Sequence, residues 1–193
     1  MTRGTFFLIF ILVAVVAILS YVAVVQSVKT PQEEISTQNL TPTPNPSLIP
    51  STTLTSSPSA SLVRIGASQT ISILADSGEN SLTTVQLELG FDPKFIEVQK
   101  VEPGTFFDNP TILLNEVDKT NGRIMLALGS LTPKKGNGVL ATVTIRGISP
   151  TGPTGKTTDI TFLPKTQILG SSNENLESLL RKAINAQIIV TQQ

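Results

Sequence analysis

From residue 62 onward, apolar and polar residues alternate in short runs, which is the period of a β-strand with one buried face. In residues 83–91, for example, Val85, Leu87 and Leu89 fall on one side of the strand and polar residues on the other. Turn residues separate the runs at the spacing typical of an all-β sandwich. The predicted strands are residues 63–65, 69–75, 83–91, 95–101, 111–117, 123–128, 139–148, 159–164 and 186–191.

Two turns between these strands have a clear chemical basis. Pro93 lacks an N–H and holds the preceding residue extended, while the Asp92 carboxylate can accept hydrogen bonds from the backbone just beyond it. We therefore predict a corner at residues 91–93, with Asp92 as a structural cap rather than a catalytic acid. Asn121-Gly122 tolerates positive φ and predicts a hairpin between strands 111–117 and 123–128.

One stretch near the C-terminus, residues 171–186, departs from the period of two. Its apolar residues recur at helical spacing, with acidic residues early and basic residues late, as the helix dipole favours. We predict a short helix here, covering one end of the sandwich, and the alternative is a surface loop that leads into the last strand. The residues at helical spacing are Leu176, Leu179, Leu180, Ala183 and Ile184.

The N-terminal part of the chain contains an apolar run without a charge, residues 6–25. A run of roughly 20 such residues spans a bilayer as a helix, and Arg3 before it favours a cytoplasmic N-terminus. We predict an uncleaved signal-anchor in residues 1–29 and an extracellular C-terminal domain. A cleaved signal peptide is the alternative, although residues 24–27 offer a poor cleavage site. A pilin-like leader would need a glutamate where Ile9 stands.

Residues 30–61 are rich in Pro, Thr and Ser and poor in apolar side chains. Such a segment cannot bury enough surface to offset its ordering entropy, so it predicts a disordered stalk between the membrane and a domain at residues 62–193. The stalk either serves as a spacer or is a merely tolerated linker. Its composition also suits O-glycosylation.

The composition of the chain excludes several kinds of catalysis and binding. The chain has no cysteine, no histidine and zero net charge, which excludes disulfides, thiolate nucleophiles and Ser-His-Asp triads, and gives no basic face for nucleic acid. We expect no cofactor or metal. A glycoside hydrolase needs two carboxylates in one cleft, and no spacing singles out a pair among Glu88, Asp92, Glu97 and Glu116. We therefore expect a binding protein and not an enzyme.

Four motifs stand in the order found in one known family. They are an aromatic-Asp-Pro corner at residues 91–93, a strand exit at Val101-Glu102-Pro103-Gly104, the Asn121-Gly122 hairpin, and the run from Gly138 to Ile145 beginning Gly-Val-Leu-Ala-Thr. In these motifs the chain resembles a cohesin domain over most of residues 62–190. The resemblance implies a nine-stranded jelly-roll sandwich, here with one short helix near its end. It also implies non-covalent docking of a dockerin-like module or another protein partner.

If the family's partner face carries over, it lies on the sheet formed by the strands that contain Thr84, Met125 and Thr142. Apolar residues beside polar ones on that face suit an interface core with a polar rim. The other interpretation is an ordinary solvated sheet face. The partner-binding residues that this resemblance implies are Thr84, Gln86, Glu88, Met125, Ala127, Leu140, Thr142, Thr144 and Arg146.

Carbohydrate binding is a second hypothesis, because related sandwiches bind polysaccharides. Such modules stack sugars on exposed Trp or Tyr rings. This chain has no Trp, and its one Tyr, Tyr21, lies in the predicted membrane segment. Phe106 and Phe107 are the one adjacent aromatic pair in the predicted domain.

Overall fold

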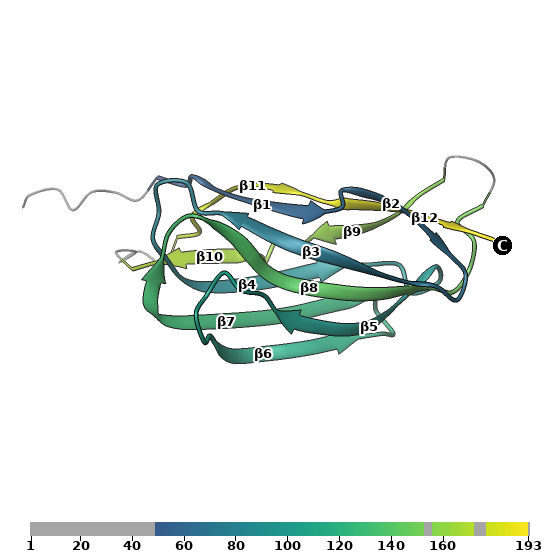
Figure 1. Ribbon diagram of the computed structural model, residues 1–193, viewed down its shortest axis with the longest axis horizontal. Helices are drawn as coiled ribbons and strands as arrows, with labels where there is room; N and C mark the ends of the chain where they lie inside the picture. Colours follow the sequence, from purple (N-terminus) through teal and green to yellow (C-terminus); the bar gives the residue numbers. More distant parts are fainter. Residues whose placement is uncertain (1–48, 153–155, 172–176, 193) are drawn as a thin grey trace, which may run out of the picture. The chain divides into compact units, whose positions relative to one another are not determined.

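The computed structural model describes residues 49–152, 156–171 and 177–192, and in them the chain forms twelve strands and no helix (Figure 1). The strands are β1 (Thr52–Ser57), β2 (Ala60–Arg64), β3 (Ser68–Asp76), β4 (Leu82–Gly90), β5 (Ile96–Pro103), β6 (Thr111–Asp118), β7 (Arg123–Lys134), β8 (Asn137–Gly147), β9 (Thr158–Phe162), β10 (Gln167–Gly170), β11 (Leu180–Ile184) and β12 (Ala186–Thr191). The predicted all-β sandwich is confirmed. All nine predicted strands are present, together with β1, β10 and β11.

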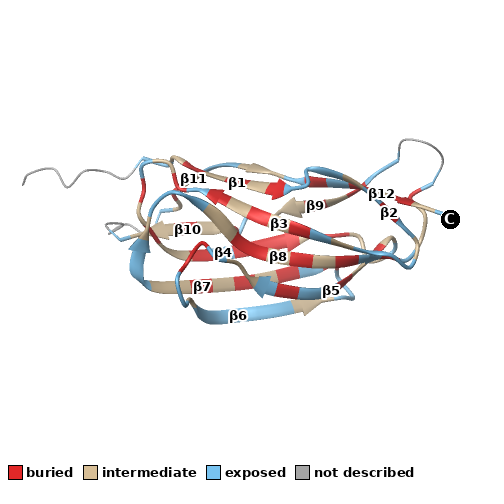
Figure 2. Ribbon diagram, viewed as in Figure 1, coloured by how far each residue is buried: buried red, intermediate tan, exposed pale blue. Residues whose placement is uncertain are grey.

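The strands form two sheets that pack face to face. One sheet has the order β11-β1-β3-β8-β5 and the other β2-β12-β9-β4-β7-β6, with β10 also paired to β4. Alternate residues of both sheets point into the core between them, as the buried positions along β3, β4, β7 and β8 show (Figure 2). Ile71, Ile73, Val85 and Leu87 are among these core residues.

The strand β1 lies within the predicted stalk, so the stalk cannot extend to residue 61. Thr52, Leu54 and Ser56 are buried on alternate positions of β1, and the strand pairs antiparallel with β3 and parallel with β11. Composition predicted disorder because only Leu54 in this strand is a large apolar residue. Small hydroxyl side chains can be buried in a sheet where the backbone is paired, and that possibility leaves no trace in composition.

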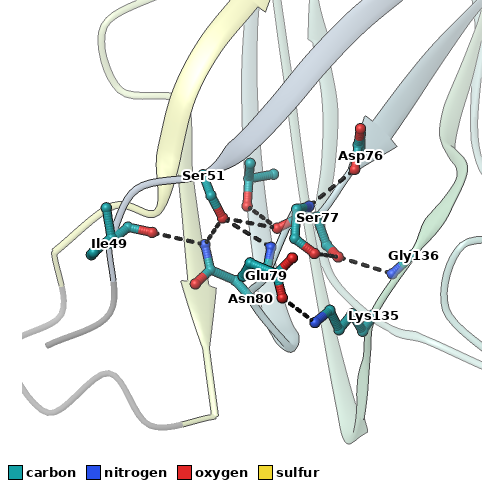
Figure 3. A network of polar contacts seen from close by, with 10 residues as sticks. Ile49, Ser51, Asp76, Ser77, Glu79, Asn80, Lys135 and Gly136 are labelled. Atoms are coloured by element: carbon teal, nitrogen blue, oxygen red, sulfur yellow. Dashed lines mark hydrogen bonds and ion pairs between the residues drawn. The ribbon is translucent and has the colours of Figure 1, made fainter. Parts of the chain in front are cut away.

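A polar network fixes the start of β1 (Figure 3). The amide Nδ2 of Asn80, in the β3–β4 turn, donates to the carbonyl of Ile49 at 3.2 Å and to Ser51 Oγ at 2.8 Å. Ser77 in the same turn accepts from the N–H of Gly136 at 2.9 Å through its Oγ. Ser77 and Asn80 are both buried. The beginning of the domain is therefore held to the β3–β4 and β7–β8 turns.

The prediction of a helix at residues 171–186 is wrong for the part of this range that the structure describes. Residues 172–176 lie outside the described residues, and Leu180–Ile184 is the strand β11. Leu179 is buried just before it and donates its N–H to the carbonyl of Ile168 at 2.8 Å. Pairing with the edge of β1 satisfies the β11 backbone and overrides a helical pattern of only a few turns.

The Asp-Pro corner carries the chain between the two sheets, because β4 and β5 belong to different sheets. The carboxylate of Asp92 accepts from the N–H of Lys94 at 2.9 Å, which confirms its predicted role as a cap. The predicted hairpin between β6 and β7 is also confirmed. Gly122 in its loop has φ of 66°, and a Cβ there would collide with the carbonyl oxygen of Phe91. The corner and the hairpin therefore pack against each other.

The predicted signal-anchor falls in residues 1–48, which lie outside the described residues. Among the residues that the structure does describe, none belongs to a helix long and apolar enough to cross a membrane.

Candidate functional site

Five of the nine predicted partner-binding residues lie together on the outer face of one sheet. Gln86 on β4 is directly opposite Ala127 on β7, and Glu88 is opposite Met125. Thr84 continues the same row of β4 and stands opposite Gly129. The prediction of a shared face is correct for these two strands, because period two puts every second residue of adjacent strands on the same side.

The other four residues lie on β8, which belongs to the opposite sheet. The prediction that all nine share a face is therefore wrong. Period two shows that Thr142, Thr144 and Arg146 alternate with core residues, but it cannot show which sheet their strand joins. Leu140 was expected to be exposed and is only 1% exposed. It is the extra residue of a bulge between β8 and β3, so the alternation breaks there and Leu140 enters the core.

Glu88 is also less accessible than its position on the strand suggests. It is buried, and its Oε1 lies 3.2 Å from Nη1 of Arg123. Thr166, on the β9–β10 connection, exchanges hydrogen bonds with the Glu88 backbone at 3.0 and 3.2 Å. This connection therefore runs beside β4. The carboxylate of Glu88 forms an ion pair with Arg123 at the side of the face, so it is already paired within the protein.

Three exposed apolar side chains follow one another on the edge strand β6 of this sheet, where no sequence argument had placed a site. Ile112 pairs with Leu128 and Leu114 with Ala127, so Leu113 is the extra residue of a bulge. The bulge puts Leu113 and Leu114 on the outer side together: Leu113 Cδ1 is 3.5 Å from where a Cβ of Gly129 would stand. Leu113 is 62% exposed and Leu114 40%. The sequence signal is the run of three apolar residues, which violates strict alternation.

These side chains form an apolar patch with a polar border. We define the docking patch as Leu113, Leu114, Met125 and Ala127. Thr84 and Gln86 border it on the β4 side, and Glu116 and Asp118 follow along β6 opposite Met125 and Arg123. Asp118 accepts from the side chain of Asn121 at 2.7 Å, and this hydrogen bond is the main cause that lowers the pKa of Asp118.

The aromatic pair considered for sugar stacking lies inside the domain. Phe106 and Phe107 are both buried, with ring centroids 4.9 Å apart in an edge-to-face arrangement. Neither ring can therefore serve as a surface platform for a sugar.

Comparison with known families agrees with the fold and with the motif order. The family model described as the cohesin domain matches residues 66–190. The chain belongs to the cohesin family. No curated protein sequence matches it. The match to the cohesin model begins after β1 and β2, so those two strands precede the matched region.

Several solved cohesins share the fold. A non-cellulosomal cohesin from the archaeon Archaeoglobus fulgidus is 17% identical, with a TM-score of 0.56 over 72% of this chain and 91% of that one. A type I cohesin–dockerin complex from Clostridium thermocellum contains a chain 19% identical, with a TM-score of 0.59 over 74% and 94%. A cohesin in complex with a dockerin from Acetivibrio cellulolyticus is 15% identical, with a TM-score of 0.58 over 72% and 99%.

Proposed function

We propose that this cohesin binds a dockerin-like protein module non-covalently through the outer face of β4, β7 and β6. The observation that carries the proposal is the docking patch, in which a bulge places two exposed leucines beside Met125 and Ala127. Two of the three similar structures described above are cohesin–dockerin complexes, which supports a partner of that kind.

The chemistry of the patch suits protein docking. Covering a leucine side chain contributes roughly 1.5–3 kcal/mol, so two leucines and a methionine give a small interface a central source of affinity. Glu116 and Asp118 make its β6 border acidic. The complementary partner therefore presents an apolar stripe flanked by basic residues, since opposite charges at a rim favour the correct partner.

A charge introduced at the centre of the patch tests the proposal. The full-length protein and its Leu114→Glu variant are titrated calorimetrically with dockerin modules of the source organism. We expect wild-type binding and at least about a hundredfold loss in the variant, because an unpaired buried charge typically costs several kcal/mol. Thr144→Glu makes the same kind of change on the opposite sheet and should leave the affinity unchanged.

The same experiment shows which group of the predicted residues binds the partner, the one on β4 and β7 or the one on β8. If Thr144→Glu abolishes binding and Leu114→Glu does not, the partner uses the β8 side and the docking patch is wrong. If the wild-type protein binds none of the dockerin modules, the proposed function is wrong.

We further propose that the docking domain is held at the outer surface of the cell membrane by residues 6–25. The support is the sequence: an uncharged apolar run of membrane-spanning length, a basic residue before it, and a Pro-, Thr- and Ser-rich segment after it.

A further inference from the structure

A shallow, open cavity of about 560 Å³ lies on the surface at the end of the proposed docking face, where β4 meets β9. Its lining includes Gly90, Asp92, Asn121, Arg123, Asp159 and Thr161. Gly90 keeps this space open: a Cβ there would lie 3.1 Å from Thr161 Oγ1 and 3.2 Å from Leu163 Cδ2. Gly90 is paired with Arg123, two residues from Met125, so the cavity adjoins the docking patch.

One carboxylate in the lining, that of Asp159, has an oxygen without a hydrogen bond to any described residue. Asp159 and Thr161 alternate with the buried Ile160 along β9 and face outward. Oδ1 of Asp159 is buried, and no hydrogen-bond partner for it exists in the described part of the chain. Leaving such an oxygen unpaired is costly, so a rotation of the carboxylate that brings this oxygen to a donor in the cavity is favourable.

The remaining charges of the lining are already engaged within the protein. Asp92 accepts from the N–H of Lys94 through Oδ1, which leaves Oδ2 of that carboxylate to accept from a further donor. Arg123 is paired with Glu88 at 3.2 Å. The lining therefore contains two carboxylates, Asp92 and Asp159, and one cation, Arg123, that Glu88 already neutralises. The cavity presents net negative charge to an incoming group.

We propose that this cavity receives an arginine side chain of the docked partner, with Asp159 and Asp92 as its acceptors. Guanidinium carries five donors in a planar fork that fits carboxylates in pairs. The cavity is far larger than a single ion, and the described residues contain no group of three or more acids that could hold a metal ion. The proposal rests on the proposed docking function and adds the chemistry that selects the partner.

A small-molecule probe tests the cavity without any partner. The full-length protein is titrated with N-acetyl-arginine amide while backbone amide signals are followed by NMR. We expect saturable shifts at Gly90, Asp159 and Thr161 with a roughly millimolar Kd, and none with the uncharged analogue N-acetyl-citrulline amide. Asp159→Asn, which keeps the shape and removes the charge, should abolish the shifts. Equal shifts with citrulline, no shifts with arginine, or larger shifts at the same amides with calcium chloride would overturn the proposal.

Dockerin binding then separates this proposal from the proposed function. Asp159→Asn should weaken binding about tenfold, as expected for a lost charge-assisted hydrogen bond. The matched control Asp108→Asn changes an exposed acid between β5 and β6 and should have no effect. If Asp159→Asn has no effect while Leu114→Glu abolishes binding, the cavity proposal is wrong and the docking function stands. If arginine binds the cavity but no dockerin binds the protein, the docking function is wrong.

Discussion

At the scale of single residues, the side chain of Asn80 holds the first residues of the domain to the β3–β4 turn. Its Nδ2 donates to Ile49 and to Ser51, and the residue is buried. We expect Asn80→Ala to lower the free energy of unfolding by about 1–3 kcal/mol, because it removes the two hydrogen bonds of a buried side chain. Urea denaturation followed by circular dichroism measures this. Asn137→Ala, at an exposed position, should change the stability by less than about 0.5 kcal/mol, and equal effects of the two variants would contradict the prediction.

The carboxylate of Asp118 makes the β6–β7 hairpin sensitive to acid. Hydrogen bonds from the side chain and backbone of Asn121 lower its pKa. A carboxyl whose folded pKa is depressed contributes stability that is present above its unfolded pKa, about 3.9, and is lost as the pH falls through the folded value. We expect Asn121→Ala to raise the Asp118 pKa toward the ordinary value, as followed by carboxyl-carbon NMR. Lys119→Ala in the same loop should leave it in place. A titration midpoint that Asn121→Ala does not move would disprove the cause.

At the scale of secondary-structure elements, Leu54 shows that β1 is an integral strand of the fold. This leucine is fully buried, whereas Leu131 is fully exposed. We expect Leu54→Ala to destabilise the domain by about 2–5 kcal/mol, because it leaves a cavity in the core. Leu131→Ala is the matched control and should have little effect in thermal melting. A melting temperature for Leu54→Ala close to that of Leu131→Ala would mean that β1 does not stabilise the domain.

The elements also show how far the sequence can predict this fold. Period two located β2 to β9 and β12, and turn chemistry located the Asp92 cap and the Gly122 hairpin. It could not locate β1, whose buried residues are mostly small hydroxyls. The pattern could not locate β11 either, because this segment has helical spacing and its backbone is paired with the edge of β1.

The candidate site was predictable in part for a similar reason. Alternation identified the outward residues of β4 and β7, but bulges moved Leu140 into the core and Leu113 out of it. A bulge depends on pairing with a distant strand, and so does the sheet that β8 joins. Neither can be determined from the local pattern alone.

At the scale of the whole molecule, the apolar run at residues 6–25 predicts that the domain is held at the membrane. We expect the mature protein to remain in the membrane fraction with its N-terminus intact, because the run is long enough to span the bilayer and its end is a poor cleavage site. Cell fractionation and N-terminal sequencing check this. Recovery from the medium with a new N-terminus near residue 30 would show that the protein is secreted instead.

The bulge at Leu113 also affects how the protein behaves when it has no partner. Within the described residues β6 pairs only with β7, so its outer edge is a potential template for aggregation. An uninterrupted edge strand with three apolar residues in succession would recruit further strands and grow into fibrils. The extra residue breaks the regular spacing of donors and acceptors along that edge. The bulge that places two leucines on the outer face therefore also hinders edge-to-edge aggregation of the domain. Under the proposed function, it favours recognition through side chains over the addition of a strand.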